Sequence, residues 1–434
     1  MAFRFPSVKR TTILIFVIGL VLLGILVSAA LYFSPSRKPA VPAELRGAAE
    51  VAGFSGIRYT LEEESKVLLD VIKSESGIEG TDNKKPLFVR SGNGKYRPVN
   101  LLALSSGADG GAFGAGFLNG WTVAGNRPQF DIVSGTSAGA LISPFAFLGA
   151  KYDDDLKSIF TNSSPRKIFA WRNIVASLLD DAVADTSPLI ETIKRYITRD
   201  VVNEIAGEYE RGRLLVVTTT NLDSRHTVLW NMTKIASLAA NGNSGAVDLF
   251  RKVLLASASI PGIFPPVMFD VEAGGKRYHE MHADGAIMSQ FVVDPSWLAD
   301  TGVDRLPDII RERRLYLIRN TRREPLVMDV SRNTVDILIR SMKILVYSQG
   351  IVDLYRIYMS AKQHGVDYNL AHVPESFDLP HKEYFDQEFM RKLYAVGFSE
   401  ARNGYRWKKH PWLYGGVSAD GFKSDSLNQS SGYQ

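Results

Sequence analysis

The sequence predicts an α/β fold with a mainly parallel central sheet covered by helices on both faces. Short apolar runs of strand length alternate with longer helix-like segments, and the clearest runs are 100–105, 130–133, 214–220 and 315–319. Such alternation is typical of parallel strands joined by helical crossovers. In sheets of this kind, functional residues gather at the carboxyl ends of the strands. We therefore expect the chemistry in the loops that follow the first two runs.

The composition fits a globular protein with a large core and restricts the chemistry. The chain has 434 residues, of which 45% are hydrophobic and 22% charged, and its net charge is +5. It has no cysteine, which excludes disulfides, a cysteine nucleophile, cysteine–zinc sites and an N-terminal lipoprotein cysteine. Its seven histidines show no metal-ligand spacing, so we expect no metal and no cofactor. The chain lacks a dense Lys/Arg run, so we expect no nucleic-acid partner, whereas mild basicity suits an anionic membrane surface.

The N-terminal region predicts a membrane anchor. Residues 11–33 carry no charge and would form a helix about 35 Å long, enough to span a bilayer. Basic residues within 1–10 predict that this end stays cytoplasmic and that the rest is extracytoplasmic, hence periplasmic in a Gram-negative bacterium. The competing interpretation is a cleaved signal peptide and a secreted protein, since Ser28-Ala29-Ala30 resembles a cleavage site. We prefer the anchor because the apolar run is longer than a usual signal core.

The remaining chain divides by composition. Residues 34–48 contain three prolines and form a semi-rigid linker, and residues 49–99 extend the α/β domain at its N-terminus. Residues 100–296 are the expected core of this domain, and 297–417 its C-terminal part. Gly, Ser, Asn and Gln dominate 418–434, which predicts a disordered tail.

A glycine-rich loop follows the first predicted strand. Residues 105–116 include Gly107, Gly110 and Gly111, which let the backbone approach a ligand and expose N–H groups where a helix starts. The loop has neither a Gly-Lys-Ser/Thr sequence nor the Gly-x-Gly-x-x-Gly spacing, so an oxyanion hole suits it better than a phosphate cradle. A tight turn that uses glycine only for packing is the alternative.

The second predicted strand leads into the sequence Gly135-Thr136-Ser137-Ala138-Gly139. This Gly-x-Ser-x-Gly pattern is that of a nucleophile elbow, in which a strained turn exposes the serine hydroxyl between two small residues. A helix that begins at Ser137 would favour negative charge at its N-terminus. The motif alone is common, but a strand before it and an apolar helix after it favour the elbow over a bland glycine-rich turn.

Four stretches, taken in order, make the chain resemble the patatin-like phospholipase family. The loop at 105–116 is similar to the family's oxyanion loop, and 135–139 is similar to its nucleophile elbow. The run Ala-Ser-Ala-Ser-Ile-Pro-Gly-Ile-Phe-Pro-Pro at 256–266 follows a family sequence closely. Asp284-Gly285-Ala286 resembles the family's Asp-Gly-Gly/Ala motif. The resemblance covers roughly residues 100–296 and implies a patatin-like α/β fold.

The resemblance implies a serine–aspartate dyad without histidine. Ser137 would attack an ester carbonyl, and Asp284 would accept its proton as general base and pass it to the leaving alkoxide. Gly135 and Gly139 would form the nucleophile elbow, and Gly285 and Ala286 would complete the aspartate motif. The backbone N–H groups implied for the oxyanion hole belong to Gly107, Ala108 and Asp109, with Ala138 as a further donor.

Two features depart from the family pattern or compete with the dyad. Ser106 and Ala108 stand where the family has its first and third glycine, and Gly110 stands where it has a basic residue. Ala108 can donate its N–H if its φ stays negative. His282 lies two residues before Asp284 and would share its face on a strand, so a histidine-containing triad is a competing arrangement.

The expected function is therefore that of a membrane-anchored serine lipid acyl hydrolase, of phospholipase A or lysophospholipase type, acting on membrane lipids. One alternative is a thioesterase, carboxylesterase or acyltransferase that uses the same dyad. The other is a catalytically silent, membrane-bound lipid-binding protein, which the altered glycine loop suggests.

Overall fold

The computed structural model describes residues 39–60, 98–162, 184–295, 312–324, 334–380 and 384–412, with the isolated residues 18, 19, 21, 24, 168, 170, 171 and 332. The predicted anchor at 11–33, apart from four of these isolated residues, and the predicted tail at 418–434 lie outside them and stay predictions. Within the described part of the chain, no helix is both long and apolar enough to cross a membrane.

The chain forms two compact units. The smaller comprises the described residues of Met1–Gly53 together with Phe269–Glu280, and the larger comprises those of Phe54–Met268 and Met281–Gln434. The smaller unit contains the short helix η1 (Ala43–Ala48) and strand β1 (Glu50–Val51), which pairs antiparallel with β9 (Val267–Ala273). The candidate site lies wholly in the larger unit.

The larger unit is built on a sheet whose centre is parallel. Neighbouring strands follow the order β7-β4-β3-β11-β12, and each of these pairs is parallel. These strands are β3 (Val99–Leu104), β4 (Ile132–Thr136), β7 (Leu214–Asn221), β11 (Arg313–Arg322) and β12 (Asp367–Val373). Every residue of β3, β4 and β7 is buried, as expected for strands covered on both faces.

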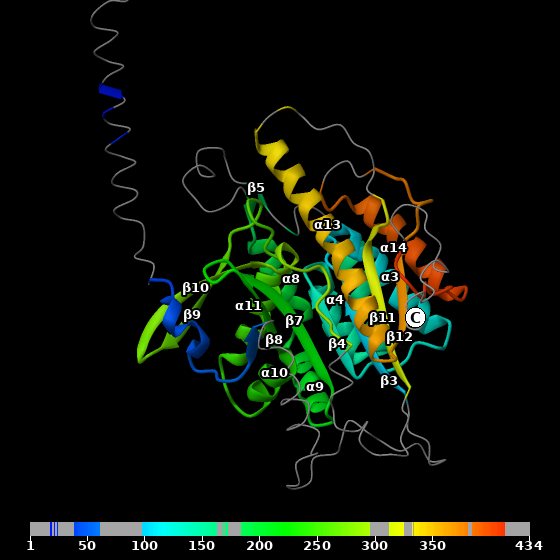
Figure 1. Cartoon of the computed structure of the whole chain (residues 1–434), viewed down its shortest axis with the longest axis horizontal. Coiled ribbons are helices and arrows are strands. Elements are labelled where there is room, and N and C mark those ends of the chain that lie inside the picture. Colours follow the sequence, from blue (N-terminus) through cyan, green and yellow to red (C-terminus); the bar gives the residue numbers. More distant parts are fainter. Residues whose placement is uncertain are drawn as a thin grey trace, which may run out of the picture. The chain divides into compact units, whose positions relative to one another are not determined.

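Helices cover both faces of this sheet (Figure 1). On one face, Trp121 of helix α3 (Gly111–Val123) contacts Tyr316 of β11, and helix α14 (Gln387–Arg402) packs on α3. On the other, Leu315 and Leu317 of β11 join a core cluster with residues of helix α13 (Thr334–Gln363). The expected α/β fold with a helix-covered central sheet is confirmed.

The remaining helices of the described region complete these layers. They are α4 (Ala138–Leu148), α5 (Asp153–Thr161), α8 (Ser187–Tyr196), α9 (Arg199–Tyr209), α10 (Met232–Ala240), α11 (Ala246–Ser257) and the short helices η2 (Ala108–Gly110), η3 (Ala150–Tyr152) and η4 (Gly285–Ile287). Strands β5 (Ala170–Trp171) and β6 (Ala184–Asp185) form a separate two-stranded sheet.

Antiparallel strands extend the sheet beyond β7, where the sequence predicted mainly parallel pairing. Strand β8 (His226–Asn231) pairs antiparallel with β7, and β2 (Arg58–Thr60) pairs antiparallel with β8. The end of β10 (Lys276–Asp284) also pairs antiparallel with β7. The short connection of four residues between β7 and β8 explains one of these pairings, since parallel strands need a longer crossover.

The two edges of β7 decide where the site forms. Strand β8 takes one edge along 216–221, so β4, which pairs with 214–218, must take the other. Strand β10 pairs with 219–221 on that second edge, directly beyond β4. Thr136 lies opposite Thr218 and Asp284 opposite Thr219, so β4 and β10 run towards each other along this edge and meet end to end.

Candidate active site

The turn after β4 holds Ser137 in a strained conformation. Its φ is +56° and its ψ −119°, a region that costs a residue with a side chain about 1–3 kcal/mol. The Ser137 N–H donates to Oγ of Ser257 over 3.0 Å, which helps to hold the turn. A Cβ on Gly139 would lie 2.2 Å from the carbonyl oxygen of Leu104, and one on Gly135 would lie 2.4 Å from that of Gly139. Glycine is therefore required on both sides of this serine.

Ser137 and Asp284 are in direct contact. The Ser137 hydroxyl donates to Oδ2 of Asp284 over 2.6 Å, and the N–H of Ala286 donates to Oδ1 over 2.8 Å. The backbone of Asp284 is fixed as well, because its N–H donates to the carbonyl of Ser259 and its own carbonyl accepts from Oγ1 of Thr220. Both side chains are buried, with 5% of Ser137 and 4% of Asp284 exposed.

Burial raises the pKa of Asp284 from its ordinary 3.8 to about 7, although the hydrogen bonds from Ser137 and Ala286 lower it in part. Removal of the carboxylate from water disfavours its charged form, and no cation offsets this among the causes of the shift. A group that titrates near neutral pH and already bonds a hydroxyl is well suited to accept that hydroxyl's proton.

The glycine-rich loop after β3 is clamped by a residue of a different strand. Asn320, in β11, donates through Nδ2 to the Ser105 carbonyl over 2.7 Å and accepts the Gly114 N–H at Oδ1 over 3.1 Å. Its own N–H donates to Oγ of Ser105 over 2.8 Å. The loop lies so close to this residue that a Cβ on Gly110 would fall 2.2 Å from the Asn320 carbonyl oxygen.

The predicted oxyanion-hole residues lie beside the serine. Gly107, Ala108 and Asp109 line one cavity with Ser137, and Ala138 lines a second cavity with it. The N–H of Gly110 closes the turn by donating to the Gly107 carbonyl. This bond does not use the N–H groups of Gly107, Ala108 or Asp109. Ala138 is the first residue of α4, so its N–H has no partner within the helix.

Ala108 departs from the expectation of a negative φ. Its φ is +49°, the left-handed region that a glycine would enter without cost. Alanine pays about 1–2 kcal/mol for the same conformation because its Cβ approaches the following carbonyl oxygen. The loop thus keeps a backbone shape suited to glycine although an alanine occupies the position, and the negative φ expected as the condition for donation by the Ala108 N–H is not met. A glycine at this position could take the same φ, so the positive φ does not by itself prevent this N–H from donating.

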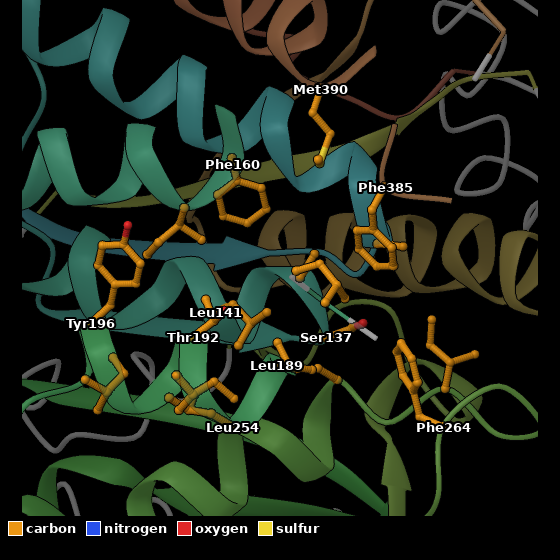
Figure 2. A pocket seen from close by; sticks show the side chains of 18 of the residues that line it. Ser137, Leu141, Phe160, Leu189, Thr192, Tyr196, Leu254, Phe264, Phe385 and Met390 are labelled. Atoms are coloured by element: carbon orange, nitrogen blue, oxygen red, sulfur yellow. The ribbon is translucent and has the colours of Figure 1, made fainter. Parts of the chain in front are cut away.

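Two cavities meet at Ser137. One has an empty volume of about 770 Å³ and a mainly apolar lining that includes Leu141, Phe160 and Leu189. Figure 2 shows this lining, with Ser137 on one side and Tyr196 across from it. The other cavity is a cleft of about 1650 Å³ that contains Asp284, apolar side chains and three cationic ones, of Arg322, Arg340 and Lys343. The residues Ala108, Ser137 and Ile260 line both.

Comparison with known proteins identifies the family to which part of the chain is similar. Residues 102–297 match the family model of the patatin-like phospholipases. This region of the chain belongs to the patatin-like phospholipase family. The crystal structure of VipD from Legionella pneumophila matches with 12% sequence identity and a TM-score of 0.34, over 75% of this chain and 71% of that chain. No curated protein matches the chain significantly.

Within the patatin-like region, the competing histidine takes another role. His282 is fully buried on β10, where its Nδ1 lies 2.8 Å from Oγ1 of Thr219 and its ring packs against Trp230. The Ser137 hydroxyl donates to Asp284 instead. Gly285 and Ala286 form the start of η4, directly after the aspartate.

Two residues that support the patatin-like site were missed from the sequence. Ser257 holds the Ser137 N–H, and it lies in the 256–266 run that carried part of the resemblance. Asn320 directly follows the predicted strand 315–319, and its place at the carboxyl end of a parallel strand was an available signal. Among the described residues, no group of three or more His, Asp or Glu side chains is arranged to hold a metal ion.

Proposed function

We propose that this protein is a serine lipid acyl hydrolase of phospholipase A or lysophospholipase type, with Ser137 as nucleophile and Asp284 as general base. The observation that carries the proposal is the 2.6 Å hydrogen bond between these buried side chains, at the meeting point of two cavities. Membership of the patatin-like family supports hydrolysis of lipid esters.

The proposed reaction begins with transfer of the Ser137 proton to Asp284 as Oγ attacks the ester carbonyl carbon. The carbonyl oxygen becomes an oxyanion, which backbone N–H groups of Gly107, Ala108 and Ala138 stabilise, with Asp109 as a further donor. The intermediate then collapses, the bond to the leaving alkoxide breaks, and Asp284 protonates that alkoxide. Water hydrolyses the acyl-enzyme by the same steps, with Asp284 again as the base, which releases the fatty acid and restores Ser137.

The two cavities suggest how a lipid would lie. The acyl chain would occupy the apolar cavity of about 770 Å³, where the burial of methylene groups favours binding. The alcohol part, with its headgroup, would occupy the larger cleft. Arg340 and Lys343 line that cleft and would favour a phosphate-bearing headgroup, whereas Arg322 is already paired with Glu375 over 2.9 Å.

The alternatives share parts of this site. A thioesterase, carboxylesterase or acyltransferase would use the same serine and aspartate, and the cationic lining of the cleft favours a phosphate-bearing substrate over a neutral ester. A catalytically silent lipid-binding protein would not need the contact between the Ser137 hydroxyl and the Asp284 carboxyl group. As an extension of the proposal, the segment 11–33 anchors the chain in a membrane and places the catalytic domain outside the cytoplasm.

Active-site labelling with a fluorophosphonate probe tests the proposal. Detergent-solubilised full-length wild type, Ser137→Ala and Asp284→Asn would be labelled, and fatty-acid release from mixed phospholipid micelles would be measured in parallel. We expect label on Ser137 in the wild type, none in Ser137→Ala and little in Asp284→Asn, with fatty acid released by the wild type alone. If the folded wild type neither takes the label nor releases fatty acid, the silent lipid-binding protein becomes the better explanation.

A further inference from the structure

Helix α13 carries an apolar stripe that faces solvent. Six of the eleven large hydrophobic side chains that are exposed among the described residues lie on this one helix. They are Ile337, Leu338, Ile344, Leu345, Val352 and Met359, which we call the α13 stripe. Between 49% and 69% of each of these side chains is exposed. Single exposed hydrophobic residues are ordinary, but a contiguous group marks an interaction surface.

The spacing makes the stripe continuous. Leu338, Leu345, Val352 and Met359 follow one another at intervals of seven residues, so they lie above one another on successive double turns. Ile337 and Ile344 widen the stripe over its first half. The distance from Leu338 to Met359 along the helix axis is about 31 Å. The opposite side of α13 is buried against the sheet through Leu354, Ile357 and Ala361.

Charge decides what covers the stripe. The charged side chains of 337–363 that reach solvent are all cationic, and they belong to Arg340, Lys343, Arg356 and Lys362. The one acidic residue of this range, Asp353, is buried. Asp336, in the first turn of the helix, is acidic and half-buried. A seven-residue repeat also suits a second copy of the helix, but two copies would bring like charges together. An apolar stripe flanked by cations is typical of helices that lie in the surface of an anionic membrane.

The stripe is joined to the candidate active site. Ile339, Met342 and Val346, on another side of the same turns, line the cleft that contains Ser137. Oδ2 of Asp353 accepts hydrogen bonds from the Gln290 N–H over 2.7 Å and from the Ser289 hydroxyl over 3.0 Å. These bonds tie α13 to the segment that follows the Asp284 motif. A lipid surface that binds the α13 stripe would therefore also lie close to the cleft.

We propose that the α13 stripe docks on an anionic lipid surface and brings the cleft to the lipids of that surface. This contact is peripheral and separate from the predicted anchor at 11–33. Docking itself does not depend on the dyad, and only its effect on turnover rests on the proposed function.

The absence of cysteine from the chain gives a direct test. A single cysteine introduced by Leu345→Cys carries an environment-sensitive fluorophore, and Val123→Cys is the matched control because Val123 is 59% exposed and lies outside α13. Full-length protein is reconstituted into vesicles of phosphatidylcholine with or without phosphatidylglycerol, some bearing nitroxide-labelled lipid. We expect a blue shift and quenching at position 345 with phosphatidylglycerol, weakened by high salt, and neither at position 123.

A second variant links docking to turnover. Leu338→Gln combined with Leu345→Gln should cut hydrolysis of vesicle lipid about tenfold or more, because each change removes apolar burial in the membrane, and should leave hydrolysis of a soluble short-chain ester unchanged. Equal or absent quenching at both labelled positions would overturn the proposal, as would disulfide crosslinking between two copies of the Leu345→Cys variant without lipid quenching. If wild type hydrolyses no ester yet position 345 is quenched, the proposed function fails and the docking stands.

Discussion

Replacement of Asp284 by asparagine removes the charge from a buried carboxyl group while it keeps nearly the same shape. In the wild type, burial raises the pKa of this group to about 7, so the folded protein binds its proton more tightly than the unfolded chain does. Loss of the proposed general base should reduce ester hydrolysis about 10²–10⁴-fold. The wild-type kcat/KM should rise with pH and level off above about 7, where Asp284 is ionised.

The same substitution should stabilise the protein at alkaline pH. The folded-state pKa of Asp284 is raised, so its contribution to the free energy of unfolding is fully present below pH 3.8 and is lost as pH rises through about 7. At 1.36 kcal/mol for each pKa unit, the whole loss is roughly 4 kcal/mol. Asparagine does not ionise, so the Asp284→Asn protein does not undergo this loss of stability. Between pH 5 and pH 8, the stability of Asp284→Asn relative to wild type should therefore increase by roughly 2–3 kcal/mol.

Urea unfolding of both proteins at the two pH values measures this difference. Ser137→Ala is the control, because it is expected to be inactive but retains Asp284. Loss of the Ser137 hydrogen bond should raise the Asp284 pKa further, so the stability of this variant should fall with rising pH at least as much as that of the wild type. If the difference in the free energy of unfolding between Asp284→Asn and wild type is the same at both pH values, the carboxyl group is not held at a raised pKa, and its proposed readiness as a base is wrong.

Three further predictions concern residues around the dyad. Tyr196→Ala should shift the preference among p-nitrophenyl esters towards longer acyl chains, since Tyr196 lines the apolar cavity across from Ser137 and its hydroxyl lies 2.9 Å from that of Ser158. An unchanged chain-length profile would contradict this. Asp353→Ala should lower the free energy of unfolding by about 2–4 kcal/mol in urea titrations, because it leaves several buried donors without an acceptor. A loss below about 0.5 kcal/mol would show that these hydrogen bonds do not hold α13 in place. Gly139→Ala should abolish soluble folded protein or lower Tm by more than about 5 °C, because its Cβ overlaps the Leu104 carbonyl, and a Tm equal to wild type would show that the turn can relax.

Local features of the sequence were sufficient to predict the parts of the site that lie within a few residues of one another. The strand expected at 100–105 is β3, one residue earlier, because a continuous apolar run can only be buried on both faces. The glycines at 135 and 139 predicted the tight turn around Ser137, since only a glycine fits where two backbone segments approach so closely.

Contacts between distant segments could not be predicted from local sequence patterns. No local pattern shows that β10 shares an edge of β7 with β4, so the contact of Ser137 with Asp284 rested on the family resemblance alone. The role of Asn320 depends on the pairing of β11 with β3, which places its amide against the glycine loop. The φ of Ala108 likewise follows from the path of the loop rather than from its own preference.

The way β4 and β10 end against each other along β7 makes the dyad dependent on strand register. Only three residue pairs, 282–284 with 221–219, set the position of Asp284 on β7. A slip of β10 by one residue would move the carboxyl group about 3.4 Å along the strand and turn it to the opposite face of the sheet. Changes in the turns that fix this register should therefore abolish the proposed hydrolysis although Ser137 and Asp284 are unchanged and the chain stays folded.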